Sequence, residues 1–229
     1  NSRMDSQRRA LPPIAVIGIG CRFPGGANTP AEFWRLLCEG VDAVSEIMPR
    51  RWDAGRWYHP DASCPGRVYT RAAGCLSDID QFDAEFFGIS PREAATMDPQ
   101  QRLLLEVAWE ALEDAAVLPE RLAGTPTGVF VGICAQEYAT LQSRDPLEII
   151  GTTNTGGASS TAANRISYQF DLRGPSYAMD TACSSSLVAI DAACKTIWRG
   201  EASLALAGGV SLLLTPEMSV GFAKARMLS

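Results

Sequence analysis

Apolar residues along the chain fall into two kinds of pattern, and the two kinds alternate. Continuous apolar runs cover residues 14–19, 127–133 and 203–214, the last interrupted by two glycines, and such runs are typical of strands buried on both faces. Between the runs, apolar residues recur every three or four positions, for example in residues 158–170, which predicts amphipathic helices. Strands and helices in this order predict an α/β fold, with helices covering both faces of a mostly parallel sheet.

Two of the expected helices have clear start signals. Thr29 is followed by Pro30 and Glu32, the order of a capping box with proline at the first helical position, and this helix is expected to pack on the core and to stop near Gly40. Asp98 precedes a longer helix with an apolar stripe. The acidic residues of that helix are interpreted as a solvated face without a catalytic role: Glu106, Glu110, Glu113 and Asp114.

Other stretches lack a clear period. Residues 49–74 are expected to form a long excursion with short strands at most, and Pro216 to begin a last short helix. Residues 151–157 contain three threonines and three glycines and predict a flexible loop, which either lines a substrate tunnel or simply connects two elements. Residues 1–12 are interpreted as a linker, a docking remnant or an expression scar, and residues 13–229 as part of one domain.

The exit of the first apolar run comes close to a dinucleotide-binding fingerprint. Gly18 and Gly20 have the spacing of its first two glycines, but Phe23 stands where the third is required. A Pro-Gly-Gly sequence follows in place of an immediate helix. We therefore expect no nucleotide to bind here.

Residues 180–187 place a thiol where an extended run, residues 176–181, turns into a helix. Unpaired N–H groups and the helix dipole favour an anion at such a position, and the thiolate is the nucleophilic form of cysteine. The same N–H groups, including that of Cys183, suit the negative oxygen that develops when a thioester is attacked. The alternative is that Cys183 is a small buried residue, the common state of a free cysteine.

The remaining cysteines suggest neither a disulfide framework nor a metal site. Seven cysteines and one histidine are present, without any Cys-x-x-Cys pair. His59 lies near Cys64, which would allow a thiol–imidazole pair, but a histidine on a loop surface is the simpler interpretation. Reduced thiols in a reducing compartment fit this pattern.

Composition and charge narrow the classes of function. The 229 residues are 46% hydrophobic, enough for a sizeable core. A formal net charge of -6, with a sequence pI near 4.9, argues against a nucleic-acid partner. No apolar run reaches the length of a membrane span, so a cytoplasmic protein with no membrane association is expected.

Several long blocks of the sequence share one resemblance. The stretch from Asp180 to Leu187, reading DTACSSSL, resembles the active-site signature of the β-ketoacyl synthase (ketosynthase) domain of modular type I polyketide synthases, in the thiolase-like superfamily. Four further blocks resemble the same family in family order: residues 14–26, 82–94, 97–113 and 163–168. The resemblance covers the chain from about Pro13 to its last residue.

The resemblance implies a fold, an activity and partners. It implies a thiolase-like α/β fold of five layers (α/β/α/β/α), with only the N-terminal half present in this chain. Cys183 would accept an acyl chain from the phosphopantetheine of an acyl carrier protein and extend it by decarboxylative condensation with a malonyl-type unit. No bound cofactor or metal is implied, and the partners would be carrier proteins, the other synthase domains and a second copy in a homodimer.

The same resemblance places two further catalytic histidines and a lysine in the second half of the domain, beyond the end of this chain. The sequence is therefore expected to be an N-terminal portion of a ketosynthase that is not competent alone, whether an expressed portion, a processed piece or one polypeptide of a split domain. Two alternatives stay open. One is a noncatalytic fragment that dimerises or binds partners, and the other is a thiolase-like acyltransferase that uses coenzyme A thioesters directly.

Overall fold

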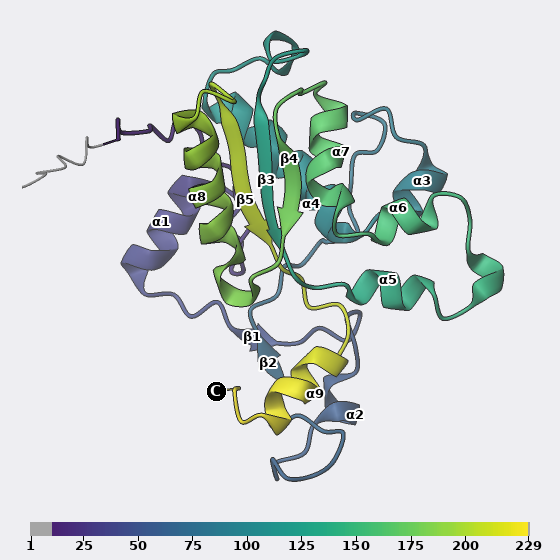
Figure 1. Ribbon diagram of the computed structural model, residues 1–229. Helices are drawn as coiled ribbons and strands as arrows, with labels where there is room; N and C mark the ends of the chain where they lie inside the picture. Colours follow the sequence, from purple (N-terminus) through teal and green to yellow (C-terminus); the bar gives the residue numbers. More distant parts are fainter. Residues whose placement is uncertain (1–10, 229) are drawn as a thin grey trace, which may run out of the picture.

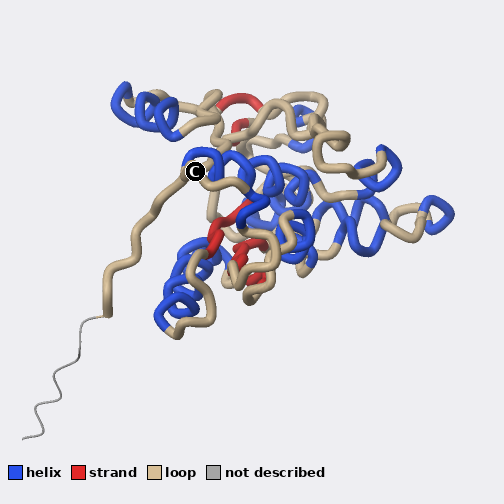
Figure 2. The backbone as a smooth tube through the Cα atoms, turned by 90° about the horizontal axis from the view of Figure 1, so that it is seen from above, coloured by secondary structure: helices blue, strands red, loops and turns tan. Residues whose placement is uncertain are grey.

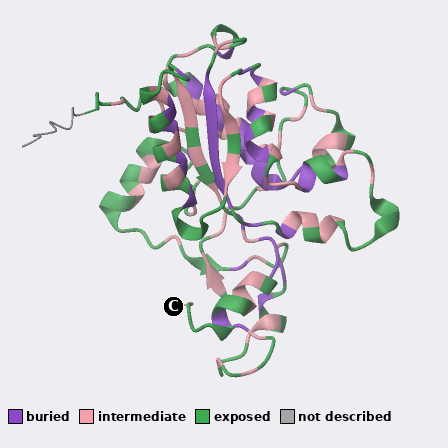
Figure 3. Cartoon of the chain, in the orientation of Figure 1, coloured by how far each residue is buried: buried purple, intermediate pink, exposed green. Residues whose placement is uncertain are grey.

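The computed structural model describes residues 11–228, so most of the predicted linker at residues 1–12 lies outside the described residues. A three-stranded parallel sheet in the order β4-β3-β5 forms the centre of the described part (Figure 1). Its strands are β3 (Gly128–Ile133), β4 (Ser176–Met179) and β5 (Ala205–Val210). The central strand β3 is buried along its whole length, whereas its neighbours are partly exposed (Figure 3).

Helices cover both faces of this sheet, as predicted. Successive side chains of β3 point to opposite faces, so Val129 and Val131 pack against α4 (Pro99–Asp114) and α7 (Thr161–Gln169), whereas Phe130 packs against α8 (Ser185–Trp198). Figure 1 shows α8 on one side of the sheet and α4 and α7 on the other, and Figure 2 shows helices on either side of the strands from above. The α/β prediction is confirmed for the described residues.

The strand predicted within residues 203–214 is shorter and less buried than expected. β5 continues through both of its glycines, Gly208 and Gly209, and its residues alternate between half-buried and exposed. Its hydrogen-bonded partner is β3 alone among the described strands, and one face lies under α8. The prediction of an interrupted, fully buried strand was therefore wrong, because apolar composition fixes neither the number of neighbours nor the cover on each face.

Residues 14–19 form no strand, contrary to the prediction. Val16 is 80% exposed and Ile17 is 56% exposed. This run lies along α4, where the backbone N–H of Ile19 donates to Oδ2 of Asp114 at 2.9 Å. Because the backbone groups of a helix are already paired within it, α4 offers this segment no ladder of hydrogen bonds.

The first helix begins as predicted but does not pack as predicted. In α1 (Pro30–Glu39), the N–H of Glu32 donates to Oγ1 of Thr29 at 3.2 Å, and the Glu32 carboxylate accepts from the N–H of Asn28, the residue before the N-cap, at 3.0 Å. The expected contribution to the core is wrong, since no residue of α1 is buried. Its main aromatic contact is a stack of Phe33 on Phe23, with ring centroids 4.3 Å apart.

The acidic face of α4 is only partly solvated. Glu113 and Asp114 are exposed as predicted, but Glu110 forms a two-pronged ion pair with Arg22. Burial raises the pKa of the half-buried Glu106. The prediction of a solvated face was wrong for these two glutamates, because the N-terminal segment covers that part of the helix.

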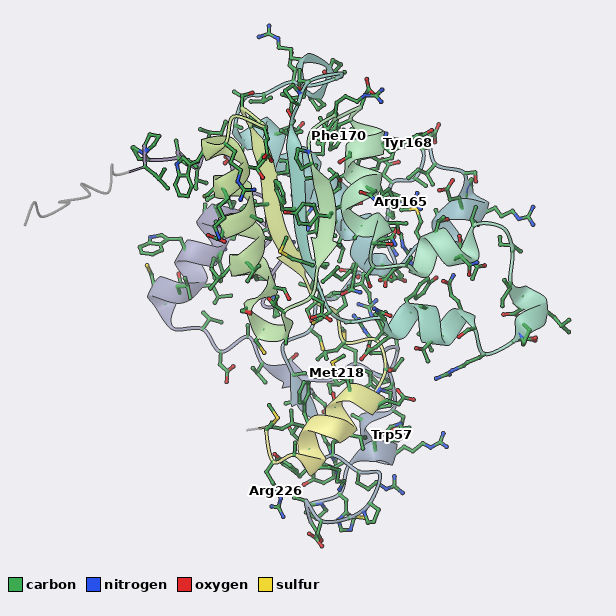
Figure 4. The ribbon with its side chains drawn as sticks, viewed as in Figure 1. Trp57, Arg165, Tyr168, Phe170, Met218 and Arg226 are labelled. Carbon is green, nitrogen blue, oxygen red and sulfur yellow. The ribbon has the colours of Figure 1, made fainter. Side chains whose placement is uncertain are left out.

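The excursion within residues 49–74 forms a separate lower part of the molecule together with the last helix (Figure 1). Residues 49–74 contain one strand of a small antiparallel pair, whose other strand precedes them, and one helical turn, which the prediction of short strands at most did not include. A hydrophobic cluster forms around Trp52, and Figure 4 labels Trp57 and Met218 in this region. The hydroxyl of Tyr69 bonds to the backbone of Leu228, which ties the excursion to the end of the described chain. The elements of this lower part are β1 (Ser45–Glu46), α2 (Ala54–Trp57), β2 (Ala72–Ala73) and α9 (Glu217–Lys224).

The predicted flexible loop at residues 151–157 contains a short helix, α6 (Thr153–Gly157). The amide group of Gln101, buried in α4, donates to the carbonyl oxygen of Gly156 at 2.8 Å and to Oγ1 of Thr161 at 2.8 Å, and these bonds fix the loop. The remaining elements are α3 (Pro91–Thr96), η1 (Pro119–Arg121), α5 (Glu137–Gln142) and η2 (Pro146–Glu148). No helix in residues 11–228 is long and apolar enough to cross a bilayer.

Candidate active site

Cys183 lies at the junction between β4 and α8, as its sequence context predicts. The chain leaves β4 at Asp180 and passes through a 3-10 turn, η3 (Ala182–Ser184), directly into α8. Cys183 is the middle residue of that turn and is exposed. The interpretation of Cys183 as a merely buried small residue is therefore wrong, and the thiol is open to a reactant.

The turn is strained at the residue before the thiol. Ala182 has φ of 55°, the left-handed region that costs a residue with a Cβ roughly 1–2 kcal/mol. Its N–H donates to Oδ1 of Asp180 at 2.9 Å and its carbonyl oxygen accepts from Oγ of Ser185 at 2.7 Å. This sharp change of direction lifts Cys183 out of the line of β4 and presents it at the start of α8.

The start of α8 sits directly on the backbone of two strands. A Cβ added at Gly132 of β3 would lie 2.6 Å from the carbonyl carbon of Ser185, and one added at Gly209 of β5 would lie 2.7 Å from Cβ of Ser186. Any side chain at either glycine would push the helix away. No local pattern in the sequence predicts this contact, since the two glycines lie in different strands and meet α8 only in the folded chain.

The carboxyl ends of the parallel strands bring two more groups to Cys183. Cys134 directly follows β3, and Asp180 directly follows β4. The pairing of Gly132 with Met179 places the carboxyl ends of these two strands side by side. Burial raises the pKa of the Cys134 thiol, and the nearby Asp180 and Cys183 raise it further. Sequence reasoning did not place Cys134 near this junction, although a residue that directly follows an adjacent parallel strand is the signal that could have found it.

The other sequence hypotheses lie away from this junction. His59 accepts a hydrogen bond at Nδ1 from the N–H of Asp61 at 3.1 Å, which matches a loop histidine and leaves Cys64 without a role as its partner. Gly18 and Gly20 pack against α4, where an added Cβ would lie 2.2 and 2.4 Å from carbonyl oxygens of that helix. Close packing therefore accounts for the glycines that resembled a nucleotide fingerprint.

Residues 11–228 contain no group of three or more His, Cys, Asp or Glu side chains that could hold a metal ion. Two cavities, of about 280 and 310 Å³, lie elsewhere and are not lined by Cys183. The first lies between α3 and the loop before α6, and the second between the N-terminal segment and α4. The seven cysteines lie among the described residues, and all are free thiols.

Comparisons with known proteins agree on one family. The model of the family described as "Beta-ketoacyl synthase, N-terminal domain" matches residues 11–229. One phenolphthiocerol/phthiocerol polyketide synthase subunit of Mycobacterium tuberculosis is 51% identical over 217 residues, which are 95% of this chain and 14% of that protein. Another subunit of the same synthase is 52% identical over 217 residues, which are 95% of this chain and 12% of that protein. The chain thus spans a small part of the curated relatives it matches.

Solved structures give the same result. The oxazolomycin ketosynthase domain from Streptomyces albus JA3453 superposes with a TM-score of 0.85 at 42% identity, covering 92% of this chain and 37% of that chain. The ketosynthase from module 6 of the bacillaene synthase of Bacillus subtilis 168 superposes with a TM-score of 0.82 at 37% identity, covering 94% of this chain and 34% of that chain.

Proposed function

Because the chain belongs to the β-ketoacyl synthase family, whose N-terminal domain it matches, we propose that Cys183 is the nucleophile of a polyketide synthase ketosynthase. The observation that carries this proposal is an exposed thiol on a strained turn at the start of α8. Its substrate is an acyl chain held as a thioester on the phosphopantetheine of an acyl carrier protein. We place the reaction in the cytoplasm, where the free thiols would stay reduced.

The first half-reaction is a transfer between two thiols. The Sγ of Cys183 attacks the thioester carbon, and the bond from that carbon to the phosphopantetheine sulfur breaks as the new thioester forms. The departing thiolate takes up the proton that Cys183 releases. The N–H of Cys183 lies in a first helical turn, where N–H groups have no partner within the helix, and it would stabilise the oxyanion.

The second half-reaction belongs to the intact domain. Decarboxylation of a malonyl-type unit releases carbon dioxide and leaves a carbanion, which attacks the acyl carbon on Cys183, forms the new carbon–carbon bond and releases Cys183 as its thiolate. The only histidine of this chain, His59, lies in the lower part and bonds to Asp61. We therefore assign acyl acceptance to this chain and decarboxylation to groups that the resemblance places in the second half of the domain.

The decisive experiment is intact-protein mass spectrometry after incubation with a short acyl thioester. We expect one acyl adduct per chain, absent from Cys183→Ala and retained in Cys38→Ala, which removes an exposed thiol on α1. An adduct that survives Cys183→Ala, or equal labelling of several cysteines, would refute the assignment. A faster reaction with acyl coenzyme A than with the acyl carrier protein would favour the thiolase-like alternative.

A noncatalytic role in dimerisation has one observation in its favour. β4 is at the edge of the described sheet, and its Tyr177 is 47% exposed. A second copy could pair with this edge by strand addition, because an edge strand presents unpaired backbone groups. Sedimentation velocity of the chain and of Tyr177→Asp tests this, since a dimer lost in the variant supports pairing at β4 and a monomer in both excludes it.

A further inference from the structure

The residue before the candidate nucleophile is held at both of its peptide groups by side chains. Ala182 adopts the left-handed conformation at φ of 55°, and its N–H donates to the Asp180 carboxylate at 2.9 Å. Its carbonyl oxygen accepts a hydrogen bond from the Ser185 hydroxyl at 2.7 Å. An alanine leaves this conformation readily when nothing holds it, so these two bonds oppose relaxation of the turn.

Ser185 makes a second bond that closes the turn. Its Oγ accepts from the N–H of Thr181 at 2.9 Å while it donates to Ala182. One hydroxyl therefore links peptide groups on both sides of the strained residue. Ser185 is only 6% exposed, so water competes weakly for either bond.

The position of Ser185 is itself fixed by the sheet. Its Cβ would lie 2.8 Å from a Cβ added at Gly132, so α8 rests against the backbone of β3 at this residue. The backbone of β3 therefore supports Ser185, and Ser185 holds the peptide group that joins Ala182 to Cys183. Ser184 differs, because it is exposed and its Oγ bonds only to Thr181, at 2.8 Å to the carbonyl oxygen.

We propose that Ser185 is a positioning residue for Cys183: its hydroxyl holds Ala182 in the left-handed conformation and thereby fixes the direction of the thiol at the start of α8. This inference rests on the proposed function of Cys183. It makes Ser185 necessary for the geometry of acyl transfer without touching the acyl group.

The first test compares Ser185→Ala with Ser184→Ala in the full chain. The rate of acyl transfer to Cys183 is followed by mass spectrometry, and alkylation of Cys183 by iodoacetamide is followed by peptide mapping, with the exposed Cys38 as internal reference. We expect Ser185→Ala to lower both rates at Cys183 about tenfold or more, as small displacements of a reacting group do. Ser184→Ala should change them less than about threefold, since Ser184 is exposed and its Oγ bonds to a peptide group that Asp180 also holds.

A substitution that removes the strain distinguishes positioning from general support of the fold. Glycine adopts positive φ without penalty, so Ala182→Gly should restore most of the rate lost in Ser185→Ala. Thermal melting of each variant is recorded in parallel. Equal losses from Ser185→Ala with and without Ala182→Gly, or unchanged rates in Ser185→Ala, would overturn the proposal.

A second variant covers the case in which Ser185→Ala does not fold. Asp180 is exposed and holds the other side of Ala182, so Asp180→Ala should lower both rates more than Asp180→Asn, which keeps an acceptor oxygen. Equal rates in these two variants would overturn the proposal that side-chain bonds to Ala182 direct the thiol. If alkylation follows these expectations but no thioester acylates Cys183 in the parent chain, the proposed function fails while the positioning of the thiol by Ser185 stands.

Discussion

Two apolar runs of similar composition have opposite surroundings in this molecule. In β3 the side chains of Val129 and Phe130 are both 0% exposed, whereas Val16 and Ile17 in residues 14–19 are 80% and 56% exposed. β3 has a strand on each side and helices on both faces, while residues 14–19 lie along a single helix. The difference shows that an apolar run predicts extended, burial-prone chain, but its neighbours decide whether it becomes a core strand.

The largest expected contrast comes from removing one large side chain in each run. Phe130→Ala should lower the free energy of unfolding by about 3–5 kcal/mol, because Phe130 packs between α8 and Tyr177 with no exposure. Ile17→Ala should cost less than about 1 kcal/mol. Urea denaturation followed by circular dichroism measures both. Similar losses in the two variants would mean that residues 14–19 are buried in solution.

Backbone contact should give the next largest effect. Gly20→Ala places a Cβ 2.4 Å from the carbonyl oxygen of Val107 and should push residues 14–20 away from α4, at a cost of about 1–3 kcal/mol. Gly208→Ala is the matched control, since an added Cβ there meets nothing within 4 Å. At about 2–4 °C per kcal/mol for a chain of this size, thermal melting resolves the difference. A melting temperature for Gly20→Ala equal to that of Gly208→Ala would contradict the packing.

The ion pair between Arg22 and Glu110 should anchor the N-terminal segment but not β3. Its side chains are 22% and 36% exposed, so Arg22→Ala should cost about 1 kcal/mol. Amide hydrogen exchange should accelerate in residues 14–22 and stay unchanged in β3. Arg50→Ala, which removes a more exposed pair with Asp78, is the control and should leave exchange in residues 14–22 unaltered.

The smallest effect concerns pH. Burial raises the pKa of Glu106 above its usual 4.5, so the native state holds this proton more tightly and stability from this group falls as pH rises from the usual pKa through the folded pKa. Relative to the parent chain, Glu106→Gln should therefore gain no stability at the acid end, and its gain in stability should increase as pH rises. Urea midpoints from about pH 4 to about pH 8 measure it. A gain that is the same at every pH would point to packing instead of ionisation.

Local signals explain what could be predicted from the sequence. β3 and β4 were found because their patterns match strands between turn residues, and the start of α1 was found because Thr29 and Glu32 cap it locally. The thiolase-like fold rested on the resemblance and is confirmed by the match to the family and the solved ketosynthases. Burial of α1 and of residues 14–19 was mispredicted, because burial depends on neighbours that periodicity does not specify.

In the candidate site, too, local features could be predicted from the sequence and long-range neighbours could not. Cys183 was identified from its own strand-to-helix junction, which is a local signal. Cys134 and Gly132 come near Cys183 only because β3 and β4 pair in parallel register. That register joins Gly132 to Met179, which lies more than forty residues later in the sequence. The left-handed Ala182 was equally hidden, because nothing in its sequence context requires positive φ and the bonds that hold it form only in the folded turn.

The two glycines beneath α8 have an implication for how the site tolerates change. Because Gly132 and Gly209 let the start of α8 rest on main chain, the height of Cys183 above the sheet is set there by peptide groups, while core side chains such as Phe130 meet α8 further along. Substitutions in a core cluster that includes no residue of α8, such as the one around Trp52, should not alter that contact. The position of Cys183 therefore depends little on residues away from α8, while Gly132 and Gly209 keep almost no freedom to vary.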